Sequence, residues 1–213
     1  MPELTIAEEV VLIALDSETG GGKMRLGLDW AVAGAIIVEL ALIQRITLGD
    51  NDIVTVLEPV ATGVGHLDAV LADIADGVKV SKALRRARGG APDRTIAALV
   101  DRGVLHRRRT WLLGMVPAHR YPLKETSVAT GIRVRLTATV LKGHDPDERT
   151  AALIGVLHAA KLWQRAVPTG ERKRIRERMG SISQGQAISP AVRKAIVRTQ
   201  VAIAAMAAAS SSH

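Results

Sequence analysis

The chain has 213 residues, of which 47% are hydrophobic and 23% charged, a balance typical of a globular protein with one or two domains. Its net charge of +8 and pI of about 10.4 favour anionic partners, either lipid headgroups or nucleic acid. The absence of cysteine excludes disulfides, thiolate metal sites and a cysteine nucleophile. With three Trp, one Tyr and no Phe, the core must be filled by Leu, Ile, Val and Ala, which favours packed helices.

Neither a secretory signal nor a membrane-spanning segment is expected. The first 16 residues include Glu3, Glu8 and Glu9, whereas a secretory signal begins with basic residues and continues into an apolar run. Any membrane contact is therefore expected to be peripheral, at the cytoplasmic face.

The first expected helix begins at a capping box, in which Thr5 is the N-cap and Glu8 follows three residues later. A glycine-rich segment, 16–23, comes next. Its GGGK sequence lacks the first Gly and the final Ser or Thr of a nucleotide-binding P-loop, so we interpret it as a plain loop.

Residues 28–43 form the most apolar stretch, and Glu39 is the only polar residue between Ala31 and Ile43. This pattern predicts a helix that is buried on nearly all sides. It is shorter than the roughly 20 apolar residues that a membrane span needs. Because buried acids need partners, we expect Glu39 to pair with an arginine, either Arg45 or one from another helix.

Two helix-plus-hairpin units are expected in the first 122 residues. In the first, residues 45–58 alternate as a hairpin around a Gly49–Asn51 turn. In the second, a helix with Pro92 in its first turn ends at Gly103, and residues 104–121 form a hairpin. The further helices are expected at 67–74, 79–88, 127–142, from Asp145-Pro146-Asp147 to Pro168, at 171–179, and from Ser189 to Ala209, with a loop at 181–186.

The second hairpin has an apolar tip between cations. The cations before the tip are Arg107, Arg108 and Arg109, and the apolar residues are Trp111, Leu112, Leu113 and Met115. This pattern is typical of a peripheral membrane wedge, whose apolar residues enter the interface while arginines pair with lipid phosphates. A wing packed on the body of the protein and a subunit contact are equally compatible with it.

No catalytic or metal-binding set is recognisable. The histidines show neither zinc spacing nor an i, i+4 pair, and His158 lies in an apolar helix, where a packing role is expected. Neither enzymatic activity nor a cofactor is therefore predicted. The run Arg172–Arg178 is interpreted as a solvated helix face, with an accessory surface for anionic lipid or nucleic acid as the sharper alternative.

Several segments resemble the Golgi phosphoprotein 3 family in the same order and spacing. LTIAEEVVLIALD is similar to the family's opening LTLxEExLLLxL helix, GAIIVELALIQRI to its central GxxLIELALRGRL helix, and LVDRGVL to its LVEKGVL; the WLLGM hairpin and the RTAALIGVLHAAKL helix also match in position. The resemblance implies a helical fold with a four-helix core, a basic face that binds phosphatidylinositol 4-phosphate, and a hairpin for membrane contact or oligomerisation. It further implies binding of the cytosolic tails of membrane enzymes.

The resemblance places the lipid pocket near the start of the central helix, with different residues. Ala33 replaces the family's Arg before the central Gly, Met24 stands where its pocket Trp lies, and Gly89 and Pro92 replace its two later arginines. The nearest residues that could bind a headgroup are Lys23, Arg25, Trp30, Arg88 and Arg94.

The sequence therefore predicts a mainly α, single compact helical domain over 1–213, with a buried four-helix core and two β-hairpins. The predicted function is that of a non-enzymatic peripheral membrane protein that binds anionic phospholipid headgroups, holds tails of membrane proteins and self-associates through the hairpin. The residue usage favours a bacterial source. The alternatives are a winged-helix-like DNA-binding regulator, which the two helix-plus-hairpin units and the pI suggest, and a scaffold with protein contacts alone.

Overall fold

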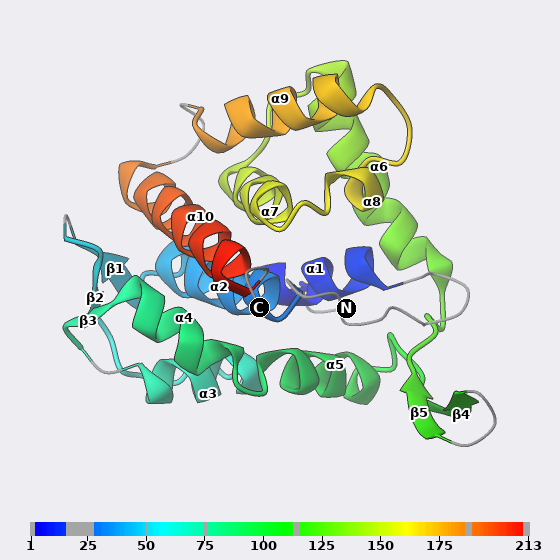
Figure 1. Cartoon of the computed structure of the whole chain (residues 1–213), viewed down its shortest axis with the longest axis horizontal. Coiled ribbons are helices and arrows are strands. Elements are labelled where there is room, and N and C mark those ends of the chain that lie inside the picture. The colour runs from blue at the N-terminus through cyan, green and yellow to red at the C-terminus, as the bar shows by residue number, and fades with distance from the viewer. Residues whose placement is uncertain are drawn as a thin grey trace.

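The computed structural model describes residues 3–15, 28–49, 51–74, 76–112, 116–185 and 189–210, and confirms a mainly helical fold (Figure 1). The helices found there are α1 (Ile6–Ala14), α2 (Leu28–Leu42), α3 (Gly65–Asp73), α4 (Val80–Arg88), α5 (Ala91–Asp101), α6 (Thr126–Lys142), α7 (Glu148–Ala159), α8 (Trp163–Ala166), α9 (Arg172–Ser183) and α10 (Pro190–Ser210). The strands are β1 (Ile46–Leu48), β2 (Ile53–Val56), β3 (Val78–Lys79), β4 (Arg108–Leu112) and β5 (Val116–Arg120).

Helix α2 is the centre of the fold, as its uniform hydrophobicity predicts. It packs against α1, α4, α7 and α10, and residues from Trp30 to Ala41 are all buried. In Figure 1, α1 and α2 lie between α7, α9 and α10 on one side and α3, α4 and α5 on the other. Helix α1 is buried along its whole length, and the predicted capping box of Thr5 and Glu8 is present at its start.

Three glutamates on the two central helices are buried and meet arginines from other helices. Glu39 on α2 is 4% exposed, accepts hydrogen bonds from Arg149 Nη1 at 2.6 Å and Nη2 at 3.2 Å, and accepts another from the Ile6 amide at 2.6 Å. Glu8 accepts two from Arg102 Nη1, at 2.8 and 2.9 Å. These pairs fix α1 between α2, α5 and α7, because each buried carboxylate must keep its partner.

The remaining buried carboxylate is Glu9, which accepts a hydrogen bond from Arg135 Nη2 at 2.6 Å through Oε1. Burial raises the pKa of Glu9, and Arg135 opposes the rise. The expectation that Glu39 pairs with an arginine is confirmed. Its partner is Arg149, whereas Arg45 pairs with Glu58.

The first hairpin belongs to a three-stranded sheet, whereas the sequence predicts two strands. Strands β1 and β2 pair in antiparallel fashion, with Thr47 opposite Thr55, as expected. A third strand, β3, adds to β2, with Val54 opposite Val78. Its two residues are too few to show an alternating pattern, so the prediction of a helix from Lys79 was wrong by one residue at its start.

Three helix boundaries that the sequence predicts in the second half of the chain differ from those in the structure. The helix expected to run to Pro168 breaks after Ala159, where Lys161 adopts φ of 56°, and resumes as α8. This helix begins after the expected start at Asp145-Pro146-Asp147, because Asp147 is the N-cap and accepts a hydrogen bond from the Thr150 amide. Helix α9 continues to Ser183, through part of the loop expected at 181–186, because Ile182 and Ser183 are buried.

Helices α7 and α10 approach closely at a glycine. A Cβ on Gly155 would lie 2.6 Å from Ile196 Cγ2, and the Gly155 carbonyl accepts a hydrogen bond from Gln200 Nε2 at 2.9 Å. The glycine therefore sets how near the two helices lie. Among the helices of the described ranges, none is both long and apolar enough to cross a bilayer.

Candidate functional site

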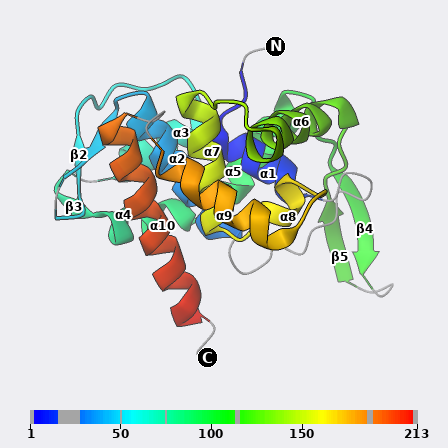
Figure 2. The same ribbon diagram turned by 90° about the horizontal axis from the view of Figure 1, so that it is seen from above.

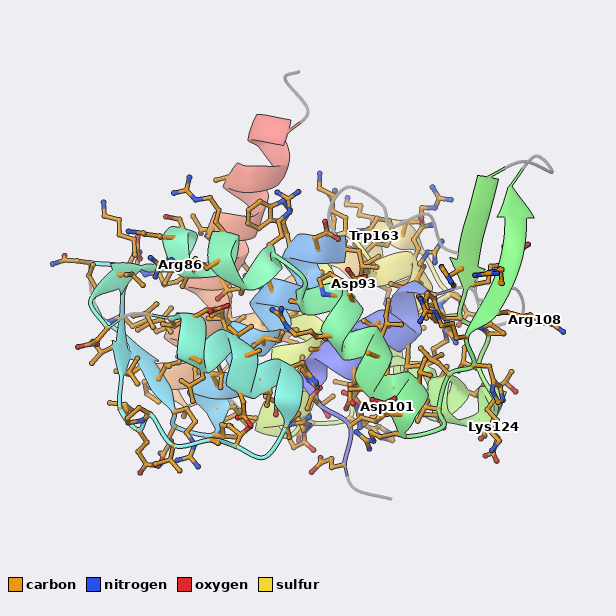
Figure 3. The ribbon with its side chains drawn as sticks, turned by 90° about the horizontal axis from the view of Figure 1, so that it is seen from below. Arg86, Asp93, Asp101, Arg108, Lys124 and Trp163 are labelled. Carbon is orange, nitrogen blue, oxygen red and sulfur yellow. The ribbon has the colours of Figure 1, made fainter. Side chains whose placement is uncertain are left out.

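The second hairpin, β4 and β5, projects from one end of the molecule, beyond the helices (Figure 1). Figure 2 and Figure 3 show that the hairpin and the free end of α10 point to the same side, which we call the projecting side. Helix α4 lies nearer to this side than α3 does (Figure 3). The projecting side therefore carries the hairpin that the sequence analysis singled out.

Buried contacts anchor the base of the hairpin to the body. Leu105 and Leu123 are both buried and form an isolated antiparallel bridge. The His106 amide donates to the Pro122 carbonyl at 3.0 Å, and the Lys124 amide donates to the Val104 carbonyl at 3.0 Å. The strands beyond this base are thus held at a fixed root while they project.

The hairpin stem brings two arginines together across its strands. Arg108 lies directly opposite Arg120, and Arg109 lies opposite His119. Arg107, Arg108 and Arg109 are exposed, and no ion pair within the described part of the chain involves them or Arg120. Because like charges directly across a strand pair destabilise it, an anion between these arginines would relieve the repulsion.

The predicted tip residues are only partly within the described ranges. Trp111 and Leu112 belong to β4, and Trp111 pairs with Pro117 in the register of the strands. Leu113 and Met115 lie outside the described residues. The insertion of this tip into a membrane therefore stays a prediction.

Helix α4 is a second cationic element. Its exposed cations are Lys82, Arg85, Arg86 and Arg88, preceded by exposed Lys79, and its sequence holds no acid. In Figure 3, Arg86 lies toward the opposite end of the molecule from Arg108, with Asp93 and Asp101 of α5 between them. The two cationic elements are thus separated by an acidic helix.

The structure brings two of the predicted headgroup residues together. The Arg88 guanidinium carbon lies 4.8 Å from the centroid of the Trp30 ring, a cation–π contact, and Arg88 Nε lies 3.6 Å from Asp29 Oδ2. Trp30 is only 6% exposed, whereas the Arg88 side chain is 45% exposed. Arg88 is therefore the accessible member of this pair. Lys23 and Arg25 lie outside the described residues.

Arg94 faces a different pocket, of about 660 Å³, whose lining includes neither Trp30 nor Arg88. Its Nη2 donates to the Gly89 carbonyl at 3.1 Å. The other polar residues that line this pocket are Glu3, Thr5, Glu8, His66, Asp101 and Arg102. Since Glu8 already pairs with Arg102 and two further acids, Glu3 and Asp101, line it, the pocket holds mixed charge and does not concentrate positive charge.

His66 is the buried titratable residue of that pocket. It is 2% exposed, and its Nε2 lies 2.9 Å from Thr5 Oγ1. Burial lowers the pKa of His66, and nearby Arg102 and Arg94 act in the same direction against Glu8 and Glu39. The imidazole is therefore neutral at physiological pH, which fits a structural role beside the α1 cap.

A smaller pocket of about 330 Å³ lies between α5 and the root of the hairpin. Asp93, Asp101, Arg107 and Tyr121 provide its polar lining. The exposed positions of α5 are Asp93, Ala97 and Asp101, so this helix presents carboxylates to solvent. A helix that reads DNA would instead need Arg, Asn or Gln at such positions.

Helix α9 carries the densest basic run, as predicted. The exposed cations are Arg172, Lys173, Arg174, Arg176 and Arg178. In Figure 1 this helix lies on the opposite side of the central layer from α4 and α5. It therefore offers a second, separate basic surface.

Sequence reasoning missed the arginines that hold the buried glutamates. Arg102, Arg135 and Arg149 were not distinguished from other surface cations, because no local pattern marks an arginine whose partner is about 100 residues away. Among the described residues, no group of three or more His, Asp or Glu side chains could hold a metal ion.

The comparison with known protein families agrees with the motifs and their order. The family model for Golgi phosphoprotein 3 (GPP34) matches residues 6–199, which covers nearly all the described helices. No curated protein matches the chain. Since the match extends from α1 into α10, the chain belongs to the Golgi phosphoprotein 3 (GPP34) family.

Proposed function

We propose that the protein is a non-enzymatic peripheral membrane protein that binds anionic lipid headgroups through its projecting side, at the cytoplasmic face of a membrane. The observation that carries this proposal is the stem of the hairpin, where exposed Arg108 faces half-buried Arg120 across the strands without a carboxylate partner in the described ranges. Cations near an anionic surface contribute about 1 kcal/mol each to binding.

Membership of the family supports the finer parts of this proposal. It favours phosphatidylinositol 4-phosphate as the headgroup, with Arg88 beside Trp30 as the accessible cation near the start of α2. It also favours an adaptor role, in which the protein holds the cytosolic tails of membrane proteins, and self-association through the hairpin. The apolar residues Trp111 to Met115 would then enter the interface, while the stem arginines pair with phosphates.

The DNA-binding alternative finds less support. The helix before the second hairpin presents Asp93 and Asp101 at its exposed positions, and carboxylates there would repel the phosphates that flank a groove. A gel shift with duplex DNA at two salt concentrations tests the alternative. A retarded complex that weakens steeply with salt would favour it.

Co-sedimentation with vesicles tests the main proposal. Wild type should sediment with vesicles that contain phosphatidylserine or phosphatidylinositol 4-phosphate and stay in solution with phosphatidylcholine alone. Replacing Arg108 and Arg109 by Gln removes two cations and should weaken binding by about 2 kcal/mol, or roughly 30-fold.

The matched control replaces Arg174 and Arg178 of α9 by Gln, which changes the net charge by the same amount at two arginines that are also exposed. This variant should bind nearly as wild type does. Equal losses in both variants would mean that binding depends only on net charge, and no binding of wild type to any vesicle would refute the proposal.

A further inference from the structure

The C-terminal half of α10 continues as a helix beyond its contacts with the body. Val192, Ala195, Ile196 and Thr199 are buried against the neighbouring helices, and Gln200 still donates to the Gly155 carbonyl. Ala202 is half-buried against the core, whereas Val201 is 64% exposed and Ala204 and Ala205 are exposed as well. Figure 2 and Figure 3 show this end standing clear of the other helices.

The free end has an unusual composition for a helix in water. Val201 to Ser210 contain no charged residue, and five of the last six before Ser210 are alanine. Alanine explains why the helix persists without packing, since elongation of an existing helix of good helix formers needs no new nucleus. The exposed side chains of Val201, Ala204 and Ala205, however, gain nothing from water and would gain from an apolar environment.

The charges that precede the free end indicate what that environment is. Helix α10 carries three cations before the free end, Arg193, Lys194 and Arg198, and its sequence holds no acid; Arg198 Nη1 also lies 2.8 Å from Asp52 Oδ1. A second copy of this helix, packed in a parallel symmetric pair, would bring the same cations together, which is unfavourable. An anionic phospholipid surface instead attracts the cations and accepts the apolar end, the arrangement of an interfacial helix.

The geometry agrees with such a partner. The free end points to the same side as the hairpin stem with its exposed arginines (Figure 3). Ten residues of helix extend about 15 Å, which is about half the hydrocarbon thickness of a bilayer, so the end can enter one leaflet but cannot span both. We infer that residues 201–210 of α10 are a second membrane-inserting element, which acts together with the hairpin on anionic bilayers; the inference rests on the proposed function.

A single cysteine makes the inference testable, because the chain has none of its own. The environment-sensitive dye NBD is attached at Ala205→Cys, on the exposed end of α10, and at Val134→Cys as a control. Val134 is 63% exposed on α6, which lies on the side away from the hairpin and the end of α10 (Figure 2). Vesicles of phosphatidylcholine with phosphatidylserine should shift the emission at Ala205→Cys to the blue and leave that at Val134→Cys unchanged.

Two exposed valines give a matched pair for binding. Val201→Asp places a carboxylate at the start of the free end and should weaken co-sedimentation with the same vesicles about fivefold. Val134→Asp makes the same change at a side chain of nearly equal exposure and should not alter it. Because both positions are exposed, the fold should tolerate both substitutions.

The outcomes separate this inference from the proposed function. If the protein sediments with the vesicles but the dye at Ala205→Cys stays in water, the inference fails while the proposed function stands. If no protein sediments, both fail. A blue shift without vesicles that grows with protein concentration would assign the free end to a second copy of the chain and would also overturn the inference.

Discussion

The pair of Glu39 and Arg149 provides the most stringent test of how the core is held. Replacing Arg149 by Met removes both hydrogen bonds from its guanidinium to a carboxylate that is 4% exposed, and leaves the Ile6 amide as the one donor to it among the described residues. Hydrogen bonds to a charged group contribute about 1.5–3 kcal/mol each, and removing one partner of a buried ion pair costs about 3–5 kcal/mol. The two estimates agree on a loss of about 3–5 kcal/mol.

Urea denaturation followed by circular dichroism measures this loss. For a chain of this size the loss corresponds to a fall in Tm of roughly 6–20 °C. Arg45→Met is the control, since it makes the same substitution in a pair with Glu58, whose side chain is 62% exposed. It should cost no more than about 1 kcal/mol.

A second variant distinguishes the loss of a charge partner from the loss of packing. Adding Glu39→Gln to Arg149→Met removes the buried charge and keeps an oxygen for the Ile6 amide. The double variant should therefore recover much of the stability that the single variant loses. If Arg149→Met costs no more than Arg45→Met, or if the double variant is less stable than the single, the role given to the pair is wrong.

Three further predictions concern packing, pH and nucleic acid. Gly155→Ala should destabilise by about 1–3 kcal/mol in urea denaturation, because its Cβ would meet Ile196 Cγ2 at 2.6 Å, whereas Gly131→Ala, in open space on α6, should stabilise by about 0.5–1 kcal/mol; a neutral Gly155→Ala would contradict the close approach of α7 and α10. Burial lowers the pKa of His66 below its usual 6.5 in the folded protein, so the unfolded chain binds more protons. The contribution of His66 to stability is therefore fully present above pH 6.5 and falls as the pH falls through the folded pKa. The His66→Gln variant should lose this part of the pH dependence, and an unchanged pH dependence of the free energy of unfolding, measured by urea denaturation, would refute the assignment. In gel shifts, the double variant Asp93→Asn with Asp101→Asn should bind DNA only weakly and in a salt-sensitive way, with the small gain expected from the loss of two negative charges. Sequence-specific binding by wild type would contradict the account of α5.

The sequence predicts those parts of the fold that depend on local patterns. The uniform hydrophobicity of α2, the capping box of Thr5 and Glu8, and the stop at Gly103 are each contained within a few residues, and the structure agrees with all three. The second hairpin is present within the expected range 104–121, with Arg108 to Leu112 paired with Val116 to Arg120.

The errors arise where tertiary contacts decide. Lys161 breaks the predicted long helix in a left-handed conformation, although neither Gly nor Pro marks the position. Ser183 remains helical because packing buries it at the end of α9. The partner of Glu39 could be predicted as an arginine but not as Arg149, because 110 residues separate the two and only the packing of α7 on α2 brings them together.

In the candidate site, too, local patterns could be predicted from the sequence, whereas features that depend on tertiary contacts could not. The cations of the hairpin are visible as a run in the sequence, but their arrangement opposite each other comes from the register of the strands. The contact of Arg88 with Trp30 depends on the packing of α4 against α2, and the position of Arg94 in another pocket depends on α3 and α5. The projecting end of α10 cannot be read from sequence, because an alanine-rich helix is equally suited to a buried position.

The central claim is that one side of the molecule meets an anionic membrane. Hydrogen–deuterium exchange of the full chain, with and without vesicles that contain phosphatidylserine, measures this for every segment at once. The account predicts slower exchange in the hairpin and the end of α10 on the projecting side, and no change in α3 and α6, which lie away from it (Figure 3). Protection of α3 or α6 with an unprotected hairpin would contradict the assigned face, and unchanged exchange throughout would contradict membrane binding itself.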